Sequence, residues 1–210
     1  MRHVALMIGA VLLASGTAVA AWKEYPQPQL GFVVEFPADP AASTGTYKTG
    51  LVTSATAHIF LAKEEHTLYS ASVIDLSDRK EEGATLLGEA ESMVRQLGDV
   101  TSVSASRVEP GRAAVFGRFM TVDCRRRATD LLGQTADSVR AWLKDIAGVE
   151  CPDRSRLMVN MFFHRGRLYM IYGINLATGE DTSGPSALRF SNSISFFAAD
   201  GTRNFADTFR

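Results

Sequence analysis

The chain has 210 residues, of which 46% are hydrophobic and 21% are charged, and its 22 basic residues nearly balance its 23 acidic ones. This balance argues against a nucleic-acid-binding protein, which normally carries a basic excess, and the hydrophobic content argues against a disordered chain. The length predicts one domain of ordinary size with a real hydrophobic core.

The first twenty residues have the three parts of a secretory signal peptide. Residues 2–3 are basic, residues 4–13 are apolar, and the run AVA at 18–20 places small residues where a signal peptidase reads. We therefore expect a signal peptide over 1–20 and a single periplasmic or secreted domain over 21–210. A membrane anchor is the weaker interpretation, because glycine, serine and threonine dilute the segment, and no later apolar run is long enough to span a bilayer.

Alternating apolar and polar residues predict strands through the first half of the mature chain. Residues 22–29 are rich in turn residues and are expected to be extended, because each proline disfavours helix at the residue before it. In chain order the expected strands are 31–36, 51–62, 66–76, 99–108 and 113–123, with a second edge strand or loop at 43–49. Pairing about the turn at 63–66 sets His58 opposite Ala71 and His66 opposite Lys63.

One amphipathic helix interrupts these strands. From about Asp78 to Leu97 the apolar residues recur at helical spacing. Asp78 and Glu81 resemble a capping box, and Gly98 suits the end of the helix. We expect this helix to lie on a sheet.

The only two cysteines, Cys124 and Cys151, enclose a segment that interrupts the sheet. Four apolar residues at i, i+3, i+4 and i+7 predict a helix within it: Val139, Trp142, Leu143 and Ile146. In an exported protein such a pair is most simply a disulfide. A redox pair would require C-x-x-C, and a zinc site would require two further ligands. We therefore predict that a disulfide closes a helical insertion over 124–151.

The last third predicts a hairpin followed by a helix and a strand. Residues 155–176 alternate on two arms around HRGR at 164–167. A short helix starting at Pro185 is expected to run into a final strand near 194–197. Helices that interrupt antiparallel hairpins indicate an α+β fold, a central antiparallel sheet flanked by helices.

Three segments in this order carry a family resemblance: GFVVEFPADP near the mature start, FFHRGRLYMIYG in the late hairpin, and ALRFSNSISFF at the end. Together they resemble the PsbP-like α/β/α sandwich superfamily, in particular its exported bacterial members of unknown function. The resemblance covers about half of the mature chain. It implies a central antiparallel sheet with helices on both faces, which the best-known members use as a binding platform. The segment between the cysteines departs from the short bacterial pattern as an insertion.

The histidines give no metal site. A site built on EEH at 64–66 would need converging ligands, whereas turn residues normally point into water. His164 lies in the HRGR turn beside Arg165 and Arg167, where an anion site competes with the ordinary interpretation of a charged hairpin tip, which we favour.

Three consecutive arginines follow the first cysteine. Held beside a fixed disulfide, Arg125, Arg126 and Arg127 are candidates to bind an acidic partner or a phosphate with forked donors. The alternative is a solvated basic loop. The carboxylates at Asp75, Asp78, Glu81 and Glu82 match no calcium loop, and acidic residues suit a helix start.

No nucleophile, metal or phosphate-binding motif is present, so neither catalysis nor a cofactor is predicted. We therefore expect an exported, non-enzymatic binding or accessory domain of the cell envelope, with an envelope protein or a small ligand as its partner. The alternative is an apolar-ligand carrier, with a pocket between sheet and helix lined by Phe116, Phe162 and Tyr169. If Trp142 and the other apolar residues of the helix are buried and the three arginines do not cluster, the insertion has a structural role and is not a binding surface.

Overall fold

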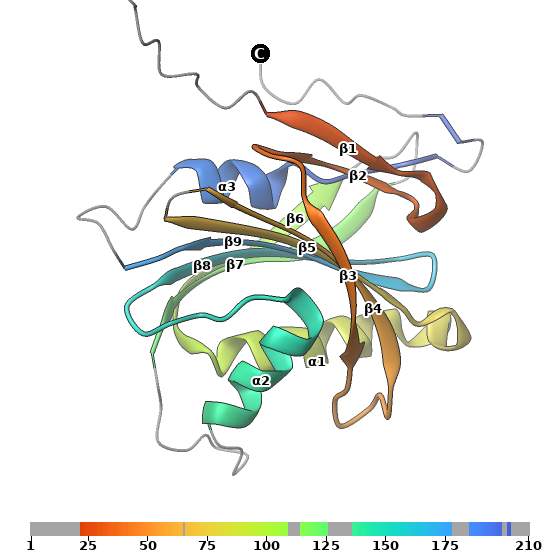
Figure 1. Ribbon diagram of the computed structural model, residues 1–210. Coiled ribbons are helices and arrows are strands. Elements are labelled where there is room, and N and C mark those ends of the chain that lie inside the picture. Colours follow the sequence, from red (N-terminus) through yellow and green to blue (C-terminus); the bar gives the residue numbers. More distant parts are fainter. Residues whose placement is uncertain are drawn as a thin grey trace, which may run out of the picture.

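The computed structural model describes residues 22–64, 66–108, 114–125, 136–177, 185–198 and 201–202, which form a mixed α+β fold dominated by sheet (Figure 1). Seven antiparallel strands make the large sheet, in the order β3-β4-β5-β9-β8-β7-β6. Its strands are β3 (Ala41–Tyr47), β4 (Ala55–Glu64), β5 (Thr67–Asp75), β6 (Gly98–Val108), β7 (Val115–Cys124), β8 (Arg156–His164) and β9 (Arg167–Asn175). No helix among these residues is long and apolar enough to cross a membrane.

Two meanders meet at the centre of this sheet. β3, β4 and β5 follow one another along the chain, and so do β6 to β9. The seam between them is the pairing of β5 with β9, which runs from Thr67 opposite Asn175 to Asp75 opposite Arg167. The sheet is therefore joined by strands that are distant in sequence.

A second, three-stranded sheet has the order β1-β2-β10, from β1 (Lys23–Gln27), β2 (Phe32–Phe36) and β10 (Ser195–Phe196). The 3₁₀ turn η1 (Pro28–Leu30) connects the first two strands. The segment expected only to be extended thus pairs as an edge strand, where Pro26 is tolerated because one side of the strand needs no hydrogen bonds.

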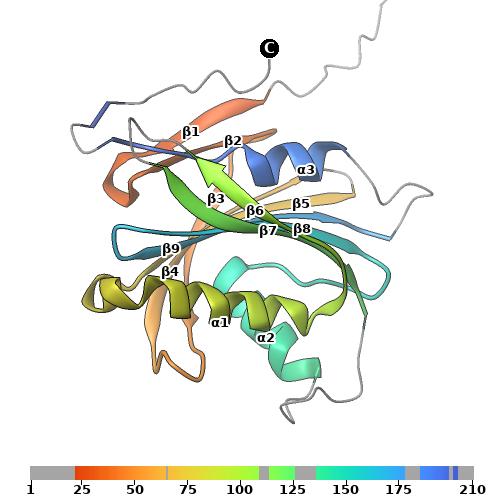
Figure 2. The same cartoon turned by 180° about the vertical axis from the view of Figure 1, so that it is seen from behind.

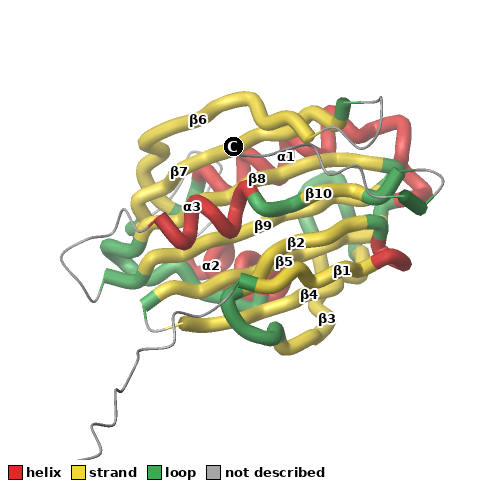
Figure 3. Tube along the Cα trace, turned by 90° about the horizontal axis from the view of Figure 1, so that it is seen from above, coloured by secondary structure: helices red, strands yellow, loops and turns green. Residues whose placement is uncertain are grey.

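Helices cover the large sheet unequally. α1 (Gly83–Arg95) and α2 (Ala136–Ala147) lie on one face, and α3 (Pro185–Asn192) lies on the other beside the small sheet (Figures 1 and 2). Seen from above, α3 and the small sheet share that face (Figure 3). The expected pattern of helices flanking the sheet on both faces is incomplete, since strands form much of the second layer.

Each face of the large sheet buries its own core. The core under α1 and α2 is mainly aliphatic, whereas the core under α3 and the small sheet is rich in aromatic rings. In the second core the rings of Phe32 and Phe196 each contact that of Tyr169 edge to face, with centroids 5.9 and 4.8 Å away. Such contacts add to the burial of large apolar surfaces.

The carboxyl end of α2 docks on the buried face of β5. Ser70 Oγ donates to the carbonyl of Ala147 at 2.6 Å, and Ser72 Oγ donates to that of Ile146 at 2.5 Å. These hydroxyls bind two carbonyls that the end of a helix leaves unpaired. Gly148 follows the last residue of the helix with φ of 66°, the left-handed conformation in which a glycine commonly ends a helix.

The first helix begins later than the sequence predicts. A 3₁₀ segment, η2 (Ser77–Glu82), precedes α1 and bends at Arg79, and no side chain caps the start of α1. The capping box expected from Asp78 and Glu81 is therefore wrong. Asp75 instead accepts hydrogen bonds from the amide and hydroxyl of Ser77.

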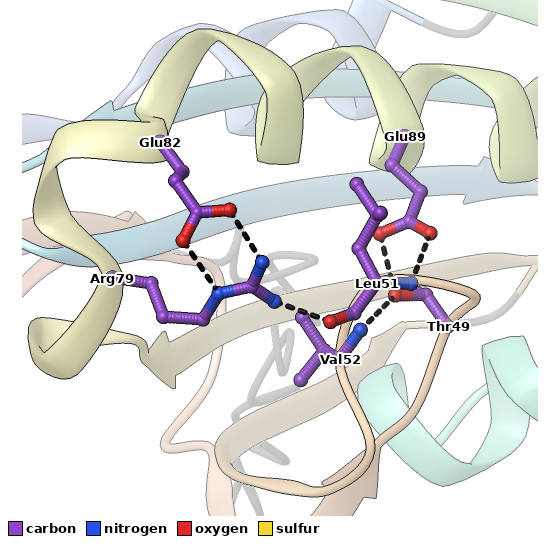
Figure 4. A network of polar contacts seen from close by, with 6 residues as sticks. All are labelled: Thr49, Leu51, Val52, Arg79, Glu82 and Glu89. Atoms are coloured by element: carbon purple, nitrogen blue, oxygen red, sulfur yellow. Dashed lines mark hydrogen bonds and ion pairs between the residues drawn. The ribbon is translucent and has the colours of Figure 1, made fainter.

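A polar network connects η2 and α1 to the loop between β3 and β4 (Figure 4). Glu89 accepts from the Thr49 hydroxyl and from the Leu51 amide. Arg79 pairs with Glu82 and donates to the Leu51 carbonyl. These contacts hold the loop against the helical layer.

The β4–β5 hairpin has a different register from the one expected. His58 lies opposite Val73 rather than Ala71, and Lys63 lies opposite Leu68 rather than His66. The turn is centred one residue later, because β4 continues to Glu64 before the chain reverses.

Candidate functional site

The disulfide is confirmed. Cys124 and Cys151 are bonded, with Cα atoms 5.9 Å apart, and both are 1% exposed. Their sulfurs belong to the core beneath α1 and α2.

The helix inside this loop contributes its apolar stripe to the hydrophobic core. All four residues of its apolar stripe are buried, with Trp142 the most exposed at 7%. The helix packs on β3, β4 and β5. At Gly45 of β3 an added Cβ would lie 1.7 Å from the Asp145 carbonyl oxygen, so backbone touches backbone here. In the described part of this helix, the apolar stripe is therefore covered by the core.

The arginine triplet is only partly within the described residues. Arg125 is exposed and forms an ion pair with Asp99, while Arg126 and Arg127 lie outside the described residues. Binding of an acidic partner by this triplet stays a prediction.

The three aromatic residues expected to line an apolar pocket do not face one space. Phe116 is 66% exposed, with the Arg107 guanidinium 5.8 Å from its ring centre. Phe162 and Tyr169 are buried and pack with Phe196. These contacts describe a filled core.

Within the described part of the chain, no three histidine, cysteine, aspartate or glutamate side chains gather closely enough to hold a metal ion. Two of the carboxylates considered for calcium, Asp75 and Glu82, are engaged by other side chains. Asp75 accepts from Ser77, and Glu82 pairs with Arg79.

The most developed candidate site lies at the β8–β9 turn. Arg165 and Gly166 have φ of 51° and 75°, the left-handed pair that a tight two-residue hairpin turn requires. The Leu76 amide donates to the Gly166 carbonyl at 2.8 Å, and an added Cβ on Gly166 would lie 2.7 Å from Ser77 Cα. The turn is therefore pinned against the end of β5 and holds its arginines on a fixed backbone.

Two guanidinium groups border this turn. Arg167 is half-buried and lies beside Asp75, with 3.9 Å between Nε and Oδ2. The Tyr169 hydroxyl donates to the Leu30 carbonyl at 2.9 Å, and like the Arg167 guanidinium it lies within 4 Å of where a Cβ on Gly31 would stand. Arg165 is exposed and forms no ion pair with a described residue. The turn thus presents one anchored and one unpaired cation.

His164 completes this cluster. Its ring lies 5.0 Å from that of Phe196, and its Nε2 is buried without a hydrogen-bond partner among the described residues. Burial, and next the charge of Arg165, lower the pKa of His164 from 6.5 to about 4. The imidazole is therefore neutral at pH 7, with one nitrogen unsatisfied.

These side chains surround a hollow of about 270 Å³, the turn hollow. Besides His164, Arg165 and Arg167, its lining comprises Pro28, Gly31, Tyr169, Phe197, Ala198 and Gly201. The contributing segments, the β1–β2 connection, the β8–β9 turn and the residues after β10, lie at one end of the molecule (Figure 1). The sequence pattern indicated the three basic residues but not the walls around them.

A second hollow, of about 410 Å³, lies between η1 and the edge of β3 and β4. Its lining includes Gln27, Gln29, Ser43, Thr44 and His58. None of its described lining residues is a lysine, arginine, aspartate or glutamate, so the turn hollow is the stronger candidate.

Comparison with known proteins adds no assignment, because no family model matches the sequence and no curated protein matches it.

Proposed function

We propose that this chain is an exported, non-enzymatic binding or accessory domain of the cell envelope, and that it recognises its partner at the turn hollow. The observation that carries the proposal is the cluster of His164, Arg165 and Arg167 around an open space on a pinned hairpin. Binding residues are commonly placed on turns held by a rigid scaffold.

Export is supported by two independent features. The first twenty residues have the composition of a signal peptide, and a buried disulfide is typical of oxidising compartments. The Cys124–Cys151 bond lies within the core, so the compartment that forms it also determines the stability of the domain.

The resemblance to the PsbP-like superfamily supports a binding role rather than catalysis. The three segments that carry it form β2, the β8–β9 hairpin, and α3 with β10. All three segments contribute to the walls of the turn hollow, through Gly31, the β8–β9 turn and Phe197. An experimental structure superimposed on superfamily members would test the assignment, which requires a common strand order.

The experiment is isolation of the tagged protein from its own envelope, followed by native mass spectrometry. We expect a chain that begins at Ala21, with both cysteines resistant to alkylation until reduced, and with a partner protein or small ligand bound. A carrier would instead show a stoichiometric apolar mass retained by the core. An untrimmed chain in the cytosol with both thiols free would overturn the proposal.

A further inference from the structure

We infer that the turn hollow binds a monovalent carboxylate attached to a small, flat apolar body. This inference rests on the proposed binding function and names the chemistry of the ligand.

The charged side chains described around the hollow favour a ligand with one negative charge. Arg165 and Arg167 bring two positive charges, and Asp75 is the carboxylate beside them. Asp75 already accepts two hydrogen bonds from Ser77 and compensates Arg167. The pKa of Asp75 is lowered, first by the Ser77 hydroxyl, so this carboxylate is ionised at neutral pH. Among the described residues, the positive charge of Arg165 is the one without a countercharge.

The geometry favours an oxyanion. A guanidinium presents parallel N–H donors that match the two oxygens of a carboxylate. Arg167 is half-buried beside Asp75, so part of its side-chain freedom is already lost before a ligand binds. His164 belongs to the same lining, and its Nε2 is buried without a hydrogen-bond partner among the described residues.

The walls favour an organic ligand over an inorganic ion. Besides its cationic side chains, the lining includes the largely apolar residues Pro28, Tyr169 and Phe197. Its volume of about 270 Å³ lies just below the range of roughly 300–1,000 Å³ common for drug-sized ligands. One aromatic ring with a carboxylate is of suitable size and polarity.

The test uses the oxidised full-length mature protein and three probes of matched size or charge. Phenylacetate is the carboxylate, phenylacetamide is its neutral counterpart, and inorganic phosphate is an anion without an apolar body. Calorimetric titration should show phenylacetate binding at least about tenfold more tightly than either of the others, because a charge-assisted pair is worth about a factor of ten or more.

Two variants locate the binding. Arg165→Asn removes the unpaired cation and keeps a residue that tolerates positive φ. Arg154→Asn is the matched control, since Arg154 is also exposed, also has positive φ at 71°, and lies at the far end of β8. We expect R165N to weaken phenylacetate binding about tenfold and R154N to leave it unchanged.

A spectroscopic readout separates binding from a structural effect. Saturation with phenylacetate should raise the pKa of His164 in an NMR titration, because a nearby anion favours the imidazolium form. Equal affinities in R165N and R154N, an unmoved His164, equal binding of the amide, or no binding at millimolar concentration would each overturn the carboxylate site. Partner capture in the envelope experiment is independent of these outcomes, so the two proposals fail separately.

Discussion

Replacing Ser70 and Ser72 with alanine tests how α2 is seated on the sheet. Both serines are fully buried on β5, and each donates its hydroxyl to a carbonyl at the end of α2. Alanine removes the donors without adding bulk, so the carbonyls of Ile146 and Ala147 lose these partners in a place closed to water.

The expected loss of stability follows from the two buried carbonyls that are left without a hydrogen bond. An unsatisfied buried polar group costs about 1–3 kcal/mol, so each single substitution should lower the free energy of unfolding by that amount. The two hydroxyls bind adjacent carbonyls of one helix end, so their effects should be coupled. We expect S70A/S72A to lose about 2–4 kcal/mol, somewhat less than the sum of the singles.

The assay is urea denaturation followed by tryptophan fluorescence, because Trp142 lies on the seated face of α2. Ser92→Ala is the matched control: Ser92 also donates to a carbonyl, that of Gly88 at 3.0 Å, but it is exposed on α1. We expect S92A to change stability little, since alanine is the better helix former. If S70A and S92A were equally harmless, the serines would not anchor the helix.

Removing the crosslink by C124A/C151A should cost about 3.5 kcal/mol for cysteines 27 residues apart, measured as unfolding free energy against the oxidised parent, and a loss below about 1 kcal/mol would contradict the loop-closure argument. Stability should also fall as the pH drops from about 6.5 to 4. The folded pKa of His164 is depressed to about 4, so the unfolded chain takes up the proton first, and the loss is on the order of 1–2 kcal/mol after allowing for partial exposure. H164Q should flatten this part of the pH profile, and an unchanged profile would refute the assignment. Gly45→Ala should cost about 2–3 kcal/mol in thermal unfolding, because its Cβ would meet a carbonyl of α2, whereas G88A should gain about 0.5–1 kcal/mol, since nothing lies within 4 Å of the added Cβ. Equal shifts for the two glycine variants would contradict this packing.

Local sequence signals predicted the elements that depend on local interactions. The β8–β9 hairpin follows from its alternating arms and from Arg165-Gly166 at the turn. The apolar stripe of α2 follows from the helical spacing of its residues. The end of the helix follows from the glycine at position 148. In these segments the residues that decide the structure are neighbours in the chain.

The elements that were missed depend on contacts with other segments of the chain. The sequence of β1 is that of a proline-rich connection. It forms a strand because it pairs with β2, and β2 pairs on its other side with β10. The start of α1 was also misplaced, since Arg79 and Glu89 are held by the β3–β4 loop. The spacing of apolar residues along a segment carries no information on such contacts.

The candidate site was predictable only in part. His164, Arg165 and Arg167 are consecutive or nearly so, and their basic character suggested an anion site that the ordinary surface interpretation outweighed. Gly31 and Phe197 come from opposite ends of the chain, and only the small sheet brings them to the same turn. The hollow is therefore a property of the tertiary structure.

The seam between β5 and β9 has a consequence for how the chain is made. Thr67 and Asn175 are 108 residues apart, and β5 finds its second neighbour only when β9 is present. During synthesis from the amino terminus, the first meander is left as an unfinished half-sheet, and distant pairing of this kind is slow to form. Assembly of the native state is thus postponed until nearly the entire polypeptide has emerged, and a nascent chain truncated ahead of β9 has nothing onto which its early strands can close.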